Sequence, residues 1–281
     1  VRFWTAEAEE VLALPMPLPG TSPDSLVSLE LGQETTCLAA RFKITRQVNP
    51  HQFRLPPQDE QGRLRRAQAE AQELAVQETL NRISRCVQVW FSVGGATELR
   101  SVVLEPQDST GSAPVTSLVV LQDADEGSSR LFVGDASGGI RVWHVQHVGG
   151  DITFEQQQLF QLAPPSAQNC SVVCMEPLQD GLLLVSTNAT SEARSSTRQG
   201  GARELLIPVA QAVHIISVHG TPSIQATLDG HKDVVACMQA LPNGDVLTGG
   251  GKFDATLQLW KNSQLQGQAE IETKSSKTLP E

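Results

Sequence analysis

Two glycine-rich segments of the sequence contain residue types that could do chemistry. Gly134-Asp-Ala-Ser-Gly-Gly139 places a serine in a tight turn, as a nucleophilic serine would require. That chemistry also needs a base and an orienting acid, and nothing in the sequence identifies them. Gly249-Gly-Gly-Lys252 has the glycines and the lysine of a phosphate-binding loop, but its spacing is different and Phe253 stands where Ser or Thr is needed. Neither segment predicts a catalytic site.

A third candidate is a zinc site made by Cys170 and Cys174, with His144 and His147 upstream. The residues between the cysteines alternate like a strand, and positions four apart in a strand lie about 13 Å from each other. That distance is too long for one tetrahedral ion with bonds to sulfur of about 2.3 Å. We interpret both cysteines as buried structural residues. The sequence therefore predicts no metal site, no cofactor and no catalytic residue.

The elements that carry these segments are short runs of alternating apolar and polar residues, separated by Gly, Asp, Asn and Pro. This pattern is typical of half-buried strands, and many of them in succession indicate a sandwich, a barrel or a propeller. The clearest runs are residues 26–31, 87–91, 99–104, 115–120, 130–134, 140–145, 182–186, 213–218 and 257–260.

Three segments depart from this pattern. Residues 48–85 form a charged insertion, helical over 54–85, in which Leu64, Ala67, Ala71 and Leu74 share one face while Leu80 and Ile83 drift off it. A solvated helix and a helix that docks a partner both fit this insertion. Residues 188–204 have the composition of a flexible loop, and residues 264–281 form a polar C-terminal segment.

One unit of strand, glycine-rich turn and strand ending in Trp occurs twice, at residues 131–143 and 247–260. A weaker copy at residues 213–218 has Ile216 where Trp would stand. Ile216 and Trp260 are 44 residues apart, close to the repeat of about 40 to 45 residues of a propeller blade. Trp4 and Trp90 would end further copies.

Residues 230–262 resemble the WD-repeat β-propeller family most closely. They contain its Gly-His pair (Gly230, His231), its turn aspartate (Asp254) and its closing Trp260, and residues 254–260 follow the family's Asp-x-Thr-Ile-x-Leu-Trp. The copy that ends at Trp143 has no Gly-His pair and has Ser137 in place of the turn aspartate. The resemblance implies an all-β fold of four-stranded antiparallel blades. Residues 1–281 would supply about four to five blades, a partial ring.

The resemblance also implies roles for individual residues. His231, a hydroxyl from the preceding strand (Thr248), Asp254 and Trp260 would form one structural hydrogen-bonded chain inside the blade. Two loops that share a face of the propeller would present the partner-binding candidates, which are Lys232, Asp233 and Phe253. A Phe253 folded back onto its own blade is the alternative.

The implied function is a non-enzymatic scaffold for protein–protein interaction in a larger, multi-subunit complex. The alternatives are an enzyme built on a propeller and an RNA-associated subunit of a ribonucleoprotein. The corresponding turns hold Ser137, Lys252 and Phe253, which are not a catalytic set. A net charge of −10 disfavours binding to nucleic acid.

Two further features bear on where the protein works. The five cysteines are odd in number and irregularly spaced, which favours a reducing, intracellular (cytoplasmic or nuclear) setting. No run of 18 apolar residues predicts insertion into a membrane. Because the chain begins with Val1, we expect it to be a piece of a longer protein, so a missing leader carries no information.

Overall fold

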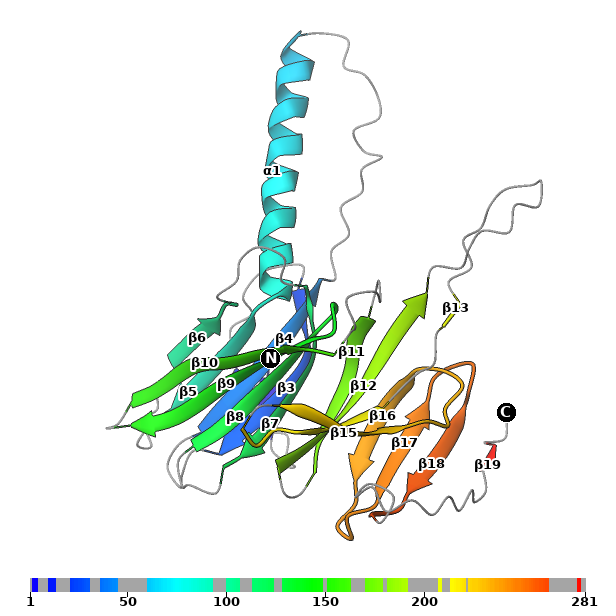
Figure 1. Ribbon diagram of the computed structural model, residues 1–281. Helices are drawn as coiled ribbons and strands as arrows, with labels where there is room; N and C mark the ends of the chain where they lie inside the picture. The colour runs from blue at the N-terminus through cyan, green and yellow to red at the C-terminus, as the bar shows by residue number, and fades with distance from the viewer. Residues whose placement is uncertain are drawn as a thin grey trace, which may run out of the picture.

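Antiparallel strands joined in the order of the sequence, together with one long helix, form the computed structural model (Figure 1). The structure describes residues 2–4, 10–13, 21–30, 36–44, 60–92, 100–106, 113–123, 128–148, 151–162, 170–178, 181–191, 207–208, 213–220, 222–262 and 277–278. The all-β class predicted from the alternating pattern is confirmed.

The described strands form five sheets. A two-stranded sheet of β1 (Arg2–Trp4) and β2 (Glu10–Ala13) comes first, and each later sheet follows the chain from one strand to the next. The second sheet has β3 (Thr21–Glu30), β4 (Thr36–Ile44), β5 (Val87–Ser92) and β6 (Arg100–Leu104); the third has β7 (Val115–Gln122), β8 (Ser128–Asp135), β9 (Gly139–Val148) and β10 (Asp151–Gln161). The fourth has β11 (Cys170–Pro177), β12 (Leu182–Ser191), β14 (Val213–Ser217) and β15 (Ser223–Leu228), with β13 (Ile207–Pro208) beside β12; the fifth has β16 (Val235–Ala240), β17 (Val246–Gly250), β18 (Thr256–Trp260) and β19 (Lys277–Thr278).

The four larger sheets share an irregularity in their first strand. In each of them the pairing with the second strand shifts by one residue, so one extra residue bulges out of the ladder and increases the local twist. The shifts fall between Pro23 and Ser25, Val115 and Ser117, Val172 and Cys174, and Val235 and Cys237. This common bulge indicates that the four sheets are copies of one structural unit.

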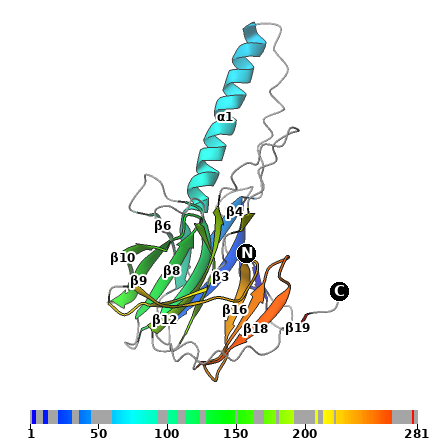
Figure 2. The same ribbon diagram turned by 45° about the vertical axis from the view of Figure 1, so that its right-hand side comes forward.

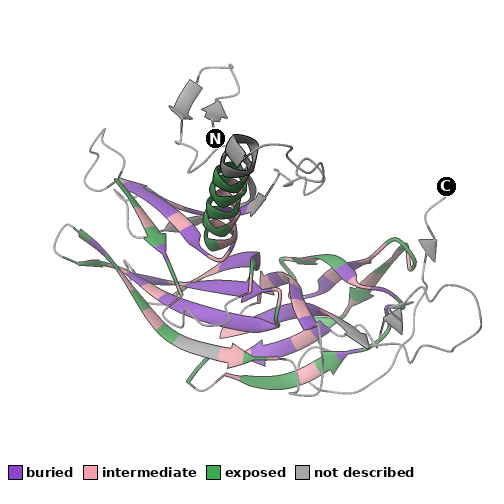
Figure 3. Ribbon diagram, turned by 90° about the horizontal axis from the view of Figure 1, so that it is seen from above, coloured by how far each residue is buried: buried purple, intermediate pink, exposed green. Residues whose placement is uncertain are grey.

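Successive sheets pack face to face along an open arc, which Figure 3 shows from above. In the third strand of a sheet, the position of the repeat Trp faces the preceding sheet. Trp143 packs in one cluster with Val89 of β5, Ile216 in the next with Phe132 of β8, and Trp260 against the cluster that contains Leu184 of β12.

The neighbouring positions of the same strands face the following sheet. The residues one and three places before the Trp position are 0–4 % exposed in the second, third and fourth sheets; they are Val87, Val89, Ile140, Val142, Val213 and Ile215. Their counterparts in the last sheet, Leu257 and Leu259, are 42 % and 49 % exposed. The same apolar pattern is thus covered in three sheets and open in the last.

A side chain of one sheet also donates a hydrogen bond to a backbone carbonyl of the next. Arg41 Nη1 donates to Val115 O at 3.1 Å, Arg130 Nη1 to Val218 O at 2.8 Å, and Ser186 Oγ to Val235 O at 2.9 Å. Unlike apolar packing, a hydrogen bond is directional, so these bonds help to fix the position of each sheet relative to the next one.

Helix α1 (Glu60–Ser84) is inserted between β4 and β5, and it stands away from the sheets in Figures 1 and 2. Its last turns touch the body: Leu80 is 1 % exposed, and Ile83 packs against Phe42 and Trp90 of the second sheet. Leu80 and Ile83, which drift off the apolar stripe of the sequence, are therefore the contacts that anchor the helix. Leu74, which lies on that stripe, is 64 % exposed.

Parts of three predicted segments lie outside the described residues. They are residues 48–59 of the insertion, residues 192–204 of the loop predicted at 188–204, and most of the polar segment at 264–281. From that last segment, β19 pairs with β18 and supplies the fourth strand of the fifth sheet.

The turn between β8 and β9 is organised by Asp135. Its Oδ1 accepts hydrogen bonds from the backbone N–H of Ser137 and Gly139, both at 2.9 Å, and from Ser137 Oγ at 2.6 Å. Its Oδ2 accepts from Arg141 Nη2 at 2.8 Å, and both side chains are about 5 % exposed. The sequence comparison puts Ser137 at the turn-aspartate position, but the carboxylate that holds this turn is two residues earlier.

We expect Asp135→Ala to lower the free energy of unfolding by about 3 to 5 kcal/mol, because the guanidinium of Arg141 would stay buried without its partner. Urea unfolding followed by circular dichroism measures this loss. The double variant Asp135→Ala/Arg141→Leu should recover part of it, because no buried charge then remains. A double variant that is less stable than the single one would show that the ion pair is not the source of the effect.

Candidate interaction surface

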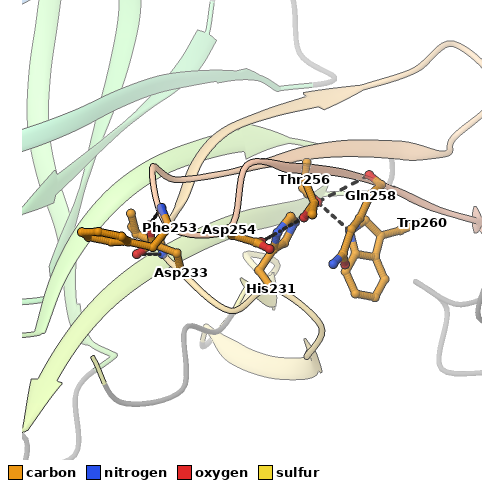
Figure 4. Close-up of polar contacts among 9 residues, drawn as sticks. His231, Asp233, Phe253, Asp254, Thr256, Gln258 and Trp260 are labelled. Carbon is orange, nitrogen blue, oxygen red and sulfur yellow. Dashed lines mark hydrogen bonds and ion pairs between the residues drawn. The ribbon is translucent and has the colours of Figure 1, made fainter. Parts of the chain in front are cut away.

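The fifth sheet carries a continuous series of hydrogen bonds between four side chains (Figure 4). Trp260 Nε1 lies 2.8 Å from Thr248 Oγ1, which lies 2.7 Å from His231 Nε2. His231 Nδ1 lies 2.5 Å from Asp254 Oδ2. The four residues come from the segment before β16, from β17, from the turn after β17 and from β18, so the series links β17 and β18 to these two connecting segments.

One assignment of protons satisfies every member of this series. The indole N–H of Trp260 donates to the hydroxyl of Thr248, that hydroxyl donates to His231 Nε2, and the Nδ1–H of His231 donates to the Asp254 carboxylate. Burial works to raise the pKa of Asp254, but hydrogen bonds from His231, Thr256 and the backbone of Lys232 outweigh it and hold that pKa below its usual value. Asp254 is therefore an anion at neutral pH, and it fixes the tautomer of His231.

Asp233 holds the turn before β18 from the other side. Its Oδ1 accepts a hydrogen bond from the backbone N–H of Val234 at 2.8 Å, and its Oδ2 accepts from the backbone N–H of Phe253 at 2.9 Å. Asp233 is buried. The carboxylate of Asp233 therefore positions the turn, and the role of Asp233 in binding a partner stays a prediction.

Phe253 points away from the sheet at the tip of this turn (Figure 4) and is 84 % exposed, so it is not folded back onto its own sheet. Lys252 and Lys232 are also exposed, and Lys252 Nζ lies 5.8 Å from the centroid of the Phe253 ring. Asp233 accepts a hydrogen bond from the backbone N–H of Phe253 and so fixes its position. The next residue, Asp254, is held by His231. The turn therefore presents an aromatic ring beside positive charge on a rigid support.

Two glycines, Gly250 and Gly251, pack closely against these carboxylates. A Cβ atom on Gly251 would lie 2.7 Å from Asp233 Oδ2, and one on Gly250 would overlap the carboxylate of Asp254. Gly250 and Gly251, which belong to the run with the composition of a phosphate-binding loop, must therefore come close to two aspartates.

The other sequence candidates lie elsewhere. Ser137 belongs to the Asp135 turn, where it donates to that carboxylate. Cys170 and Cys174 both lie in β11, and burial raises the pKa of Cys174 to about 11, so its thiol is protonated and unreactive at neutral pH. Among the described residues, no three His, Cys, Asp or Glu side chains gather closely enough to hold a metal ion.

The remaining repeat tryptophans lie in the equivalent third strands, except Trp4, which lies in β1. Trp90 packs edge-on against Phe42, with ring centroids 6.1 Å apart. Its buried indole N–H has no hydrogen-bond partner within the described part of the chain. The hydrogen-bonded series of the fifth sheet is therefore not repeated at Trp90.

Comparisons with known proteins identify one repeat. Residues 222–261 match the family model described as WD domain, G-beta repeat, which confirms the resemblance of this segment to the WD-repeat family. No curated protein matches the sequence.

Among solved structures, the chain is similar to a leech intramolecular trans-sialidase in complex with 2,7-anhydro-Neu5Ac, with 14 % sequence identity and a TM-score of 0.40. The match covers 88 % of this chain and 33 % of that one, so the chain spans about a third of that protein's length.

We expect Asp254→Ala to lower the free energy of unfolding by about 1 to 3 kcal/mol, because the Nδ1–H of His231 would be buried without an acceptor. Thermal and urea unfolding measure the loss. Phe253→Ala, one residue away, should unfold like the unmodified protein because its ring contacts solvent. Equal stability of Asp254→Ala and the unmodified protein would contradict the structural role of the series.

Ala255 provides a second test of this turn. Its φ is +48°, in the left-handed region, where a Cβ costs about 1 to 2 kcal/mol. Ala255→Gly should therefore stabilise the protein by about 0.5 to 1 kcal/mol, after the greater freedom of glycine in the unfolded chain is subtracted. Ala136→Gly, in the corresponding turn between β8 and β9 but with an ordinary φ, should instead destabilise it. Differential scanning calorimetry distinguishes the two signs.

Proposed function

We propose that the sheets are consecutive blades of a WD-repeat propeller and that the protein is a non-enzymatic scaffold that binds other proteins as part of a larger complex. The observation that carries this proposal is Phe253, a largely exposed aromatic ring on a turn that two aspartates hold rigid. A rigid framework with an exposed aromatic residue at a loop tip is the usual form of a protein-binding site, because little conformational freedom is lost on binding.

The chemistry of the turn suggests the kind of partner. The exposed cations of Lys232 and Lys252 flank the ring, so a partner segment with an apolar side chain next to a carboxylate would complement it. The buried ionisable groups of the same turn, His231, Asp233 and Asp254, are all engaged in hydrogen bonds that hold the fold. This division between buried polar residues and an exposed aromatic residue supports a binding role rather than catalysis.

The open face of the fifth sheet supports the blade assignment. Leu257 and Leu259 repeat positions that the following sheet covers in the three sheets before it. We infer that a further sheet of the same kind covers them in the assembled propeller. Membrane insertion is not part of this proposal: among the described residues, no helix combines the length and the apolar character that crossing a bilayer requires. The five cysteines are free thiols, which supports an intracellular setting.

A photo-reactive amino acid at position 253 tests the proposed binding site. In cells that make the intact protein, it should cross-link to a specific protein, and Phe253→Ala should lose that same protein in quantitative affinity purification. The matched control is position 103, because Val103 is also exposed (49 %) but lies on the outer strand β6. Cross-links shared by both positions, or no protein lost with Phe253→Ala, would contradict the assignment of this turn as a docking site.

A further inference from the structure

A cavity of about 220 Å³ lies between the third and fourth sheets. The third sheet contributes residues of β8, β9 and β10 to its wall, and the fourth contributes the segment that connects β14 with β15. Elsewhere along this seam the two sheets pack against each other through one apolar cluster. The cavity is therefore a gap in an otherwise closed contact between sheets.

The size of the cavity limits what can enter it. Sites for drug-sized ligands have volumes of about 300 to 1,000 Å³, whereas a cavity of about 150 Å³ accommodates benzene. The volume between the two sheets falls between these values. It fits one large apolar side chain, and it is too small for a nucleotide or a cofactor of similar size.

One part of the wall is apolar. Phe132, Val142 and Val218 belong to the cluster between the two sheets and are 1 %, 4 % and 5 % exposed, and Pro222 lines the cavity beside them. Gly220 also lines it, and a Cβ atom at this glycine would have no other atom within 4 Å. An apolar group in the cavity would thus contact one aromatic ring and two branched side chains, with free space beside the turn.

Arg130 supplies the polar part of the wall. Its Nε donates a hydrogen bond to Asp123 Oδ1 at 2.7 Å, and its Nη1 donates to the backbone carbonyl of Val218 at 2.8 Å. Within the described part of the chain, Nη2 has no hydrogen-bond partner, although the side chain is only 16 % exposed. A guanidinium carries five N–H groups, so Arg130 has donors left for a bound molecule.

The charges around Arg130 favour a neutral acceptor. Asp123 already balances the guanidinium, so a carboxylate in the cavity would be a buried anion without a counter-ion, on a chain with a net charge of −10. Arginines of this chain bind backbone carbonyls between sheets: Arg130 binds Val218 O, and Arg41 binds Val115 O. A further backbone carbonyl, next to an apolar side chain, has the same chemistry.

We propose that this cavity is a docking site for an extended segment of a partner protein. One side chain of the size of phenylalanine enters the apolar part, and the adjacent backbone carbonyl accepts a hydrogen bond from Arg130 Nη2. Gln157 lines the same cavity; it is the extra residue of the bulge in β10, and its exposed amide can bind the backbone of the segment. The site lies apart from the turn at Phe253, and the proposal does not depend on the function proposed for that turn.

A neutral tripeptide tests this proposal on the full chain. N-acetyl-alanyl-phenylalanyl-alaninamide should shift the methyl NMR signals of Val142 and Val218, because its ring would lie against them. The same peptide with alanine in place of phenylalanine is the control and should leave both signals unchanged. Equal responses to the two peptides, or no response to either, would overturn the proposal.

A variant that fills the cavity tests where the peptide binds. Val142→Phe places a ring in the space between the sheets and should abolish the response of the Val218 signals to the phenylalanine peptide. The matched control is Val103→Phe, because Val103 is 49 % exposed on the outer strand β6, and this variant should bind like the unmodified protein. Binding that persists in Val142→Phe would place the peptide elsewhere and contradict the assignment; circular dichroism verifies that both variants are folded.

Arg130→Lys tests the carbonyl contact and keeps a positive charge beside Asp123. It should weaken the phenylalanine peptide about fivefold, the factor that one hydrogen bond typically contributes. Toluene, which has the ring but no carbonyl, should bind the variant and the unmodified protein equally well, and this result would show that the cavity itself is unchanged. Equal weakening of the peptide and of toluene, or no weakening of the peptide, would contradict the role of Arg130.

Discussion

The constraint on which this structure depends is that a sheet with two apolar faces is stable only when both are covered. The third strands of the inner sheets direct Trp143 or Ile216 at the preceding sheet, and the residues beside them at the following one. Each sheet therefore requires two neighbours, which makes the molecule a row of mutually dependent units rather than a set of separate domains. In the fifth sheet this requirement is met on one face only: no described sheet follows it, and Leu257 and Leu259 are exposed.

The turns between strands meet a related constraint, because backbone N–H groups there have no partner in a neighbouring strand. Asp135 accepts three hydrogen bonds within its own turn, and Asp233 bridges two segments by binding the N–H groups of Val234 and Phe253. A carboxylate with several donors is costly to move, so such turns are rigid. The rigidity of the turn at Phe253 therefore follows from the requirement to satisfy buried polar groups. An exposed ring can bind a partner there with little loss of entropy.

Local patterns in the sequence predicted the strands and the best repeat well, since alternation and the run from Asp254 to Trp260 are local signals. Contacts that depend on which segments meet could not be read in this way. Asp233 follows the Gly-His pair in a loop, and only the fold brings it to the N–H of Phe253, 20 residues later. Asp135 had a usable signal, an aspartate followed by Gly138 and Gly139 in a turn, but alignment to the repeat pointed to Ser137 instead. The anchoring of α1 by Leu80 and Ile83 could be found only from the fold, which brings the last turns of the helix to the second sheet.

The most recognisable residues of the repeat are therefore poor guides to what the protein binds. His231, Thr248, Asp254 and Trp260 are recognisable because their mutual hydrogen bonds tolerate few alternatives, and the same bonds engage a polar group of each of the four side chains. In our proposal, interaction instead uses a group that the fold does not need, the exposed ring of Phe253. Such a position can change without loss of the fold, so under this proposal the residues that depart from the repeat would determine which partner is bound.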